Sequence, residues 1–183
     1  MQQFQKVLDD LEREAIFKDI EIISHAEGVF LGELVERYQP KNVLEIGTGI
    51  GYSTLFLASD LPPQGKIYTC EMDLEHLQIA RNAVNQAGVG EKVVFIDGDA
   101  FKTIPELKTK FDMAFMDGDP EDYHRYLNLI EGKLTGEAVI IASRVGLYES
   151  YMDTYLEEVR KLGGYDSKYY HLGANGIEVS VKQ

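Results

Sequence analysis

A glycine-rich segment between an apolar run and a helical pattern carries the strongest chemical signal in the sequence. Gly47, Gly49 and Gly51 alternate with other residues directly after the run Val43–Ile46 and before Tyr52. Glycine lets a backbone turn sharply and approach a ligand closely. In open α/β sheets, ligands bind outside the carboxyl ends of the strands. The segment therefore predicts a loop beneath a ligand; a tight turn that serves packing alone is the alternative.

The spacing of these glycines separates classes of nucleotide site. A dinucleotide site uses G-x-G-x-x-G, so that the following helix packs closely and receives the pyrophosphate. Here the spacing is G-x-G-x-G, and Tyr52 stands at the sixth position. The sequence also lacks the G-x-x-x-x-G-K-[ST] pattern of a P-loop. An NAD-dependent oxidoreductase is therefore disfavoured, and a P-loop nucleotide site is excluded by its motif.

Acidic residues stand at the ends of the next three apolar runs. Glu71 follows Gly49 by 22 residues, a spacing at which a carboxylate can accept both hydroxyls of a ribose. Asp99 follows the third run, where its side chain or the adjacent amides would meet an adenine edge, and Asp117 ends the fourth. These groups should gather at one edge of a sheet and predict a nucleoside site; an exposed strand-end acid is the alternative for Glu71.

Apolar periodicity indicates the elements that must position these residues. Short runs that are apolar on both parities are typical of parallel strands covered by helices, and helical patterns separate them. This alternation predicts a doubly wound α/β sheet. The predicted strands are 42–46, 66–71, 93–97, 111–117 and 138–142, with a terminal pair at 165–172 and 177–182. The predicted helices are two before Pro40, then 52–59, 74–87, 103–107, 122–133 and 150–162.

Composition limits the remaining possibilities. The chain has 183 residues, 44% of them hydrophobic, which suits one ordered domain. Its 18 Lys and Arg against 31 Asp and Glu give a net charge of −13, which argues against nucleic-acid and anionic-membrane partners. With one cysteine, Cys70, no intramolecular disulfide can form. We find no signal sequence and no apolar run of the roughly 20 residues that span a bilayer, so we expect a cytoplasmic protein.

Taken together, the motifs resemble those of class I S-adenosylmethionine-dependent methyltransferases. The closest resemblance is to the catechol and caffeoyl-CoA O-methyltransferase-like family, and it covers most of the chain from about Ile22 onward. The matching segments are His25–Leu31, Val43–Ser53, Glu71 with Ile79-Ala80, Gly98–Ala100, Phe111–Asp117 with Tyr123 and Tyr126, and Leu172–Ile177.

The resemblance implies a fold and a role for each matching residue. It implies one domain, 1–183, in which N-terminal helices (1–40) precede a Rossmann-like core (41–183) whose seven-stranded, mostly parallel sheet has an antiparallel terminal strand. S-adenosylmethionine is the implied cofactor. Its implied binding residues for the methionine part are Gly47, Gly49, Tyr52 and Ser53, with Glu45 supporting the loop. Glu71 is implied for the ribose, and Met72, Asp99 and Ala100 for the adenine. Ile23 would close over the cofactor, and Asp117 would lie beside the methionine amino group and the reaction centre.

The sequence departs from this family at the metal site. Metal-dependent members hold the ion through the aspartate at Asp117 and an Asp-Asn pair after the fifth strand, which here reads Ser143-Arg144. Serine is a poor ligand for a hard cation, and arginine offers no lone pair. Pro120 stands near the position of the catalytic lysine in catechol-type members and cannot act as a base. We therefore expect no bound metal and a solvated loop at Asp119, Glu121 and Asp122; a site rebuilt from these three acids is the alternative.

Arg144 is a candidate replacement for the missing cation. A guanidinium can stabilise an oxyanion or a substrate carboxylate, so Asp117 and Arg144 are the candidate catalytic pair. A salt bridge from Arg144 to Asp117 or Glu149 is the alternative. His25 and His171 are further candidate bases because of their near-neutral pKa, with a structural role as the alternative.

The predicted function is S-adenosylmethionine-dependent methylation of an oxygen on a small molecule, without a metal. A non-catalytic S-adenosylmethionine-binding protein is the second candidate, because the glycine loop is intact while the metal ligands are lost. The aromatic residues Tyr148, Tyr151 and Tyr155 predict a homodimer face, for which packing on the sheet is the alternative.

Overall fold

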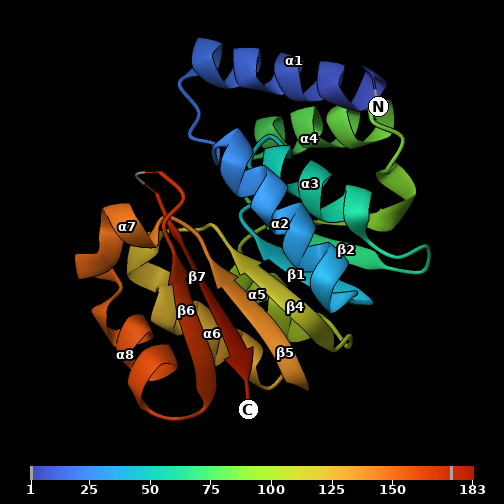
Figure 1. Ribbon diagram of the computed structural model, residues 1–183. Helices are drawn as coiled ribbons and strands as arrows, with labels where there is room; N and C mark the ends of the chain where they lie inside the picture. The colour runs from blue at the N-terminus through green and yellow to red at the C-terminus, as the bar shows by residue number, and fades with distance from the viewer. Residues whose placement is uncertain (1, 174) are drawn as a thin grey trace.

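Seven strands form one central sheet in the computed structural model, which describes residues 2–173 and 175–183 (Figure 1). The strand order is β3-β2-β1-β4-β5-β7-β6. β1 to β5 are parallel, and β7 runs antiparallel to both β5 and β6. This confirms the predicted doubly wound, mostly parallel sheet with an antiparallel terminal strand. The strands are β1 Asn42–Ile46, β2 Lys66–Glu71, β3 Val93–Asp97, β4 Phe111–Met116, β5 Leu134–Ala142, β6 Tyr165–Tyr170 and β7 Ile177–Lys182.

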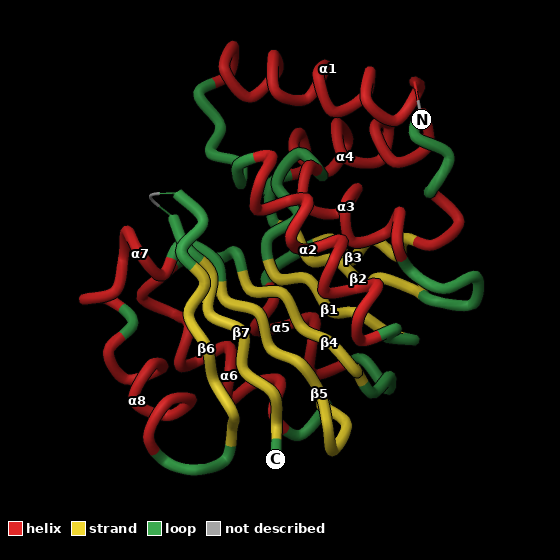
Figure 2. The backbone as a smooth tube through the Cα atoms, viewed as in Figure 1, coloured by secondary structure: helices red, strands yellow, loops and turns green. Residues whose placement is uncertain are grey.

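Helices cover both faces of this sheet. In the view of Figure 2, α5 and α6 lie behind the strands and α2 lies in front. One face carries α1 Gln2–Lys18, α2 His25–Tyr38, α3 Tyr52–Asp60 and α4 Leu74–Gln86, and the other carries α5 Ala100–Thr103, α6 Tyr123–Glu131, α7 Val145–Tyr148 and α8 Asp153–Lys161. Within the described residues, no helix is both long and apolar enough to cross a bilayer.

The two faces explain why the strands are apolar on both parities. Val43 of β1 and Met113 of β4 point into the core beneath α1 to α4. Their neighbours Leu44 and Ala114 point into the opposite core, beneath α5, α6 and α8. All four are fully buried, since successive strand residues alternate between faces.

Side chains at the helix ends fix where two helices begin. Ser24 caps α2 through its hydroxyl, which accepts from the Glu27 amide, while Glu27 accepts from the Ser24 amide at 2.8 Å. This capping box satisfies two N–H groups that the helix cannot. Asp73 caps α4 by accepting from the amides of Glu75 and His76 at 2.8 and 3.1 Å. The predicted start of each helix is thus a consequence of its capping residue.

The three largest differences from the predicted boundaries are in β5, α5 and α8. β5 begins at Leu134 rather than 138, because Thr135, Gly136 and Glu137 interrupt the apolar pattern without ending the strand. The predicted helix 103–107 is instead the one-turn α5, capped by Asp99, followed by a 3-10 turn. The predicted helix 150–162 is the shorter α8, preceded by α7 and a second 3-10 turn.

Candidate active site

The glycine loop lies directly against the end of β4. The backbone φ of Gly47 is 95°, in the left-handed region, and a Cβ there would lie 2.6 Å from the carbonyl oxygen of Asp117. The amides of Gly47 and Thr48 both donate to the Cys70 carbonyl at 3.1 Å, which anchors the loop to β2. Only glycine therefore allows the loop to sit this close to Asp117.

Glu71 is held at the mouth of the loop by three backbone amides. Its Oε2 accepts from the Gly49 amide at 2.8 Å, and its Oε1 accepts from the amides of Met72 and Asp73 at 2.8 and 2.9 Å. These bonds fix the carboxylate in one orientation. An ionised carboxylate has about four acceptor positions, so one remains for a ligand donor such as a ribose hydroxyl.

Glu45 lies beneath the loop rather than on a cavity wall. Its carboxylate is fully buried and accepts from the hydroxyls of Ser53, Thr54 and Thr69 at 2.5–2.7 Å. Burial raises the pKa of Glu45 to about 7, although the three hydroxyl bonds oppose this. Glu45 thus joins β1, β2 and the start of α3 from inside the core.

This elevated pKa predicts a pH-dependent stability. The folded-state pKa of Glu45 lies above its ordinary value of 4.5, so the folded protein binds this proton more tightly than the unfolded chain. Its stabilising contribution is complete below about pH 4.5 and is lost as the pH rises through about 7. Between about pH 5 and about pH 7.5, the unchanged protein should lose about 2 kcal/mol of unfolding free energy because Glu45 ionises. Glu45→Gln cannot ionise and should not show this loss.

Urea denaturation at the two pH values measures this difference. Glu33→Gln removes an exposed carboxylate from α2 and serves as the control, for which the difference should stay constant. If the difference for Glu45→Gln were equally constant, Glu45 would titrate at its ordinary pKa.

Three adjoining cavities open at the carboxyl edge of the parallel strands. The largest measures about 450 Å³, the second about 110 Å³ and the third about 180 Å³. Asp117 borders all three, and Gly47 and Glu71 are shared by the first two. The largest is lined by Met72, Asp99 and Ala100, and also by Phe101, Arg125 and Tyr126. The second is lined by Ile23, Gly49, Tyr52 and Ser53.

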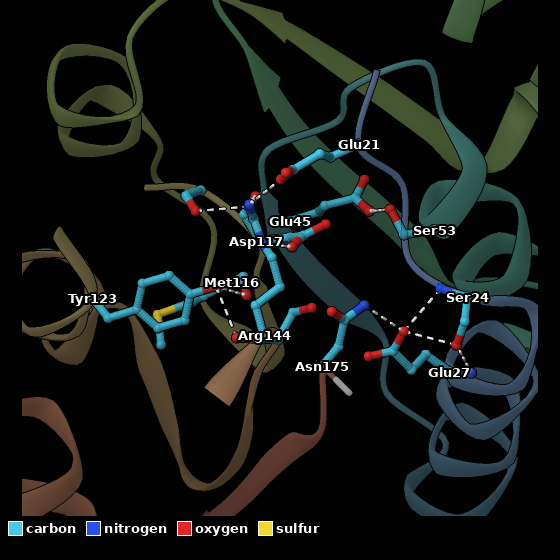
Figure 3. A network of polar contacts seen from close by, with 12 residues as sticks. Glu21, Ser24, Glu27, Glu45, Ser53, Met116, Asp117, Tyr123, Arg144 and Asn175 are labelled. Atoms are coloured by element: carbon cyan, nitrogen blue, oxygen red, sulfur yellow. Dashed lines mark hydrogen bonds and ion pairs between the residues drawn. The ribbon is translucent and has the colours of Figure 1, made fainter. Parts of the chain in front are cut away.

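The third cavity lies beyond Asp117 and is bordered by Arg144. Besides this pair, its walls are Glu21, Ile22, Ile23, Leu147 and Asn175. Asn175 donates from Nδ2 to Oε2 of the buried Glu27 at 3.1 Å, which joins the loop before β7 to the start of α2. Figure 3 shows Asn175 between Glu27 and the Arg144 backbone.

Asp117 and Arg144 form a partly buried ion pair at the boundary between the cavities (Figure 3). The Arg144 Nε donates to Asp117 Oδ1 at 2.9 Å, and Nη2 donates to the carbonyl oxygens of Asp117 and Gly118 at 2.7 and 2.9 Å. Nη1 donates to Oε2 of Glu21 at 3.2 Å. The backbone φ of Arg144 is 59°, a left-handed conformation that costs a non-glycine residue about 1–3 kcal/mol. Of the two predicted salt-bridge partners, Asp117 is the actual one; Glu149 pairs with Arg160 instead.

The electrostatics of this pair do not favour a divalent cation. Burial raises the pKa of Asp117 to about 6, while Arg144 opposes that rise. The guanidinium already uses the Asp117 carboxylate and two backbone carbonyls at this strand end, which are oxygens a hard cation would need. No cluster of three metal-ligating side chains occurs among the described residues. The residues at Ser143 and Arg144 therefore do not fit a metal site.

Several predicted residues have other contacts. The Tyr52 hydroxyl donates to Glu12 of α1, although Tyr52 also borders the second cavity. His25 packs edge-on against Phe56, and none of the three cavities is lined by His25 or His171. Cys70 is buried, and burial raises its thiol pKa to about 12, which leaves it protonated and unreactive.

The predicted homodimer face is incorrect at Tyr155. Its side chain is fully buried and packs edge-on against Tyr123, with 5.8 Å between the ring centroids. Tyr151 remains exposed. The spacing of three and four residues placed these tyrosines on one side of a helix, but the 3-10 turn at Glu149–Tyr151 separates Tyr151 from α8.

Glu21 and Leu147 are site residues that the sequence did not indicate. Glu21 lies in the irregular segment between α1 and α2, and Leu147 lies in α7, which was not predicted. Neither belongs to a motif with recognisable spacing. Asn175 belongs to the matching segment Leu172–Ile177, which could have placed it in the site. Nothing in the sequence indicated its bond to Glu27.

The sheet order, the glycine loop and the acids at the strand ends together define a class I, Rossmann-like methyltransferase fold. The family model described as "O-methyltransferase" matches residues 2–155. The chain belongs to this S-adenosylmethionine-dependent O-methyltransferase family.

Similar proteins carry related names. A catechol O-methyltransferase of Niastella koreensis is 37% identical over 108 residues, which cover 57% of this chain and 49% of that protein. The chain spans about half to two thirds of the length of the curated relatives it matches. The crystal structure of cofactor-bound Rv0187 from MTB has a TM-score of 0.82 and 29% identity, covering 88% of this chain and 81% of that one. TomG, an O-methyltransferase from Streptomyces achromogenes solved with SAM, has a TM-score of 0.90 at 23% identity, covering 97% and 89%.

Proposed function

We propose that this chain transfers a methyl group from S-adenosylmethionine to an oxygen of a small molecule, and that it does so without a divalent metal. The observation that carries the proposal is the position of the Asp117–Arg144 pair. It stands between two cavities bordered by the glycine loop and a third cavity of about 180 Å³ bordered by Ile22 and Leu147. A donor and an acceptor bound on either side would meet at this pair.

The cofactor fits the first two cavities. We assign the adenosine part to the largest cavity, where Met72, Asp99 and Ala100 would lie at the adenine and Glu71 would accept from the ribose. The methionine part belongs to the second cavity, beside Gly47, Gly49, Tyr52, Ser53 and Ile23, with Glu45 holding the loop from below. When bound, S-adenosylmethionine supplies a methyl group on a positively charged sulfur. Family membership and the cofactor-bound relatives support this assignment.

Arg144 takes the part that a metal plays in related enzymes. Its guanidinium is held by Asp117 and by two carbonyl oxygens, so its direction is fixed before an acceptor binds. A fixed cation can stabilise a negatively charged acceptor oxygen and hold it in line for transfer. Asp117 acts as the positioning residue for Arg144 and, in the proposed site, faces the cofactor amino group.

Thermal denaturation tests the cofactor assignment. S-adenosylmethionine and S-adenosylhomocysteine should raise the melting temperature in a concentration-dependent manner, whereas NAD and ATP should not. Addition of Mg²⁺ should leave these shifts unchanged, and a magnesium-dependent shift would contradict the metal-free site. Transfer of labelled methyl to a panel of phenols and carboxylic acids then separates an enzyme from a protein that only binds the cofactor.

Glu71→Gln should lower the affinity for S-adenosylhomocysteine at least about tenfold, measured by calorimetric titration. The amide would place N–H donors opposite the amides that Glu71 now accepts from, and it would lose a charged acceptor for the ribose. Glu75→Gln, on the exposed first turn of α4, is the matched control and should bind normally. Equal affinities for the two variants would remove Glu71 from the cofactor site.

We also propose that the chain acts as one domain across 1–183, that it works in the cytoplasm and that it pairs as a homodimer. Its one cysteine, Cys70, is free and buried, which suits a reducing compartment. The exposed side chain of Leu147, which borders the third cavity, and the exposed side chain of Tyr151 offer an apolar contact. Sedimentation equilibrium of the unchanged protein and of Tyr151→Ser tests the homodimer.

A further inference from the structure

We infer that Glu21 is a displaceable counter-ion of Arg144, and that the acceptor enters the third cavity as an anionic oxygen which takes the place of Glu21. The anionic oxygen belongs to a carboxylate or a phenolate of a compact molecule. This inference rests on the proposed function and names the substrate class of that same site.

The contacts of Arg144 divide into a fixed set and an exchangeable one. Nε and Nη2 donate three bonds of 2.7–2.9 Å to Asp117 and Gly118. Nη1 makes one longer bond, 3.2 Å, to Glu21. The side chain of Asp117 is 17% exposed, whereas that of Glu21 is 76% exposed. Ion pairs at exposed positions are worth little, so Glu21 is the partner that an incoming anion can replace.

Glu21 also stands in the path of an incoming acceptor. It borders both the third cavity and the cavity assigned to the methionine part of the cofactor. It belongs to the segment between α1 and α2, which has no regular secondary structure and includes Ile22 and Ile23 on the same cavity walls. Movement of this side chain therefore widens the acceptor cavity without breaking a helix.

The charges at the boundary favour exchange over addition. One guanidinium already faces two carboxylates, Asp117 and Glu21. A third anion placed beside them would face unbalanced repulsion, because like charges at short distance disfavour each other. An anion that replaces Glu21 leaves the number of carboxylate or phenolate groups beside the guanidinium at two. Inside the cavity it is also less exposed to solvent than the Glu21 side chain.

The same exchange explains how the product leaves. In the transfer, the acceptor oxygen forms a bond to the methyl carbon, the carbon–sulfur bond breaks, and its electron pair stays on sulfur. The acceptor loses its negative charge and the sulfonium loses its positive charge. The neutral product no longer competes for Nη1 of Arg144, so Glu21 can return and expel it.

Binding of simple probes tests the exchange without requiring turnover. The protein is saturated with S-adenosylhomocysteine, confirmed by its own titration, and then titrated at low salt with benzoate, 4-nitrophenolate, benzyl alcohol or benzylamine. Glu21→Gln should bind both anions about two- to fivefold more tightly, the strength of an exposed ion pair, and benzyl alcohol unchanged. Asp19→Asn removes an equal charge from the same segment, and asparagine tolerates the left-handed φ of 54° at this position. This variant should not change anion affinity.

Each outcome decides the inference. Tighter binding of benzoate alone identifies a carboxylate acceptor, and tighter binding of 4-nitrophenolate alone identifies a phenolate. Unchanged anion affinity in Glu21→Gln, an equal gain in Asp19→Asn, or preferential binding of benzylamine would overturn it. A protein that fails to bind S-adenosylhomocysteine at all would instead contradict the proposed function.

Discussion

Replacing Arg144 by glutamine is expected to lower the rate of methyl transfer about 10²–10³-fold, while the affinity for S-adenosylhomocysteine changes less than about fivefold. A fixed donor beside a charged reacting oxygen typically contributes this much to a rate. Glutamine has neither the charge nor the reach to contact Asp117 and the carbonyl of Gly118 together. Single-turnover rates with saturating cofactor and an acceptor found in the panel measure the effect on the chemical step.

Two further variants make this result specific. Arg144→Lys keeps the charge but loses the fork of N–H donors, so it should recover only part of the rate. Arg81→Gln removes an arginine whose contacts are Asp97 and the ring of Phe95, outside the three cavities, and should react normally. A full rate in Arg144→Gln would assign the guanidinium a purely structural role.

Gly47→Ala is expected to lower cofactor affinity at least about 100-fold and the unfolding free energy by about 1–3 kcal/mol. The methyl group would lie 2.6 Å from the Asp117 carbonyl oxygen, and an alanine would have to adopt a φ of 95°, a conformation that costs about 1–3 kcal/mol outside glycine. Relief of this clash requires the loop and the end of β4 to separate. Because Gly47 and Asp117 border the same two cavities, their separation removes the binding surface.

Gly88→Ala separates the effect of the clash from that of the backbone conformation. Gly88 has a φ of 77° with no atom within 4 Å of an added Cβ, and it follows α4 away from the site. This variant should lose only the conformational part, about 1 kcal/mol, and should bind S-adenosylhomocysteine normally. Calorimetric titration and urea denaturation of both variants supply the comparison; equal losses of affinity would mean that contact with Asp117 is unimportant.

Local patterns predicted most of the fold because both faces of the sheet are buried, which makes consecutive strand residues apolar. Val43 and Leu44 are apolar neighbours that pack into different cores. Asp73 is a residue type that caps helices, and it does cap the start of α4. The start of β5 was missed because Thr135–Glu137 interrupt the apolar pattern at an irregularity in the pairing with β4, which passes from Leu134 opposite Phe111 to Val139 opposite Met113. Such an irregularity conceals strand residues that periodicity alone would assign to a loop.

The site was predicted less completely, because several of its contacts join distant parts of the chain. Arg144 and Glu21 are 123 residues apart, and Asn175 and Glu27 are 148 apart. Spacing rules describe neighbours along a helix, a strand or a loop, and they contain no information about such pairs. The resemblance placed Arg144 where metal-dependent members carry a ligand. Its left-handed backbone and its four hydrogen bonds became visible only in the folded structure.

The hydrogen bond between Asn175 and Glu27 affects the order in which the site folds as the chain is synthesised. β7 inserts between β5 and β6, although it is made after both, and Asn175 reaches the start of α2 only from the loop that leads into β7. The wall of the third cavity thus depends on a strand that emerges from the ribosome late. Contacts of such long sequence separation form slowly, so the glycine loop can assemble on β1, β2 and β4 before the third cavity closes.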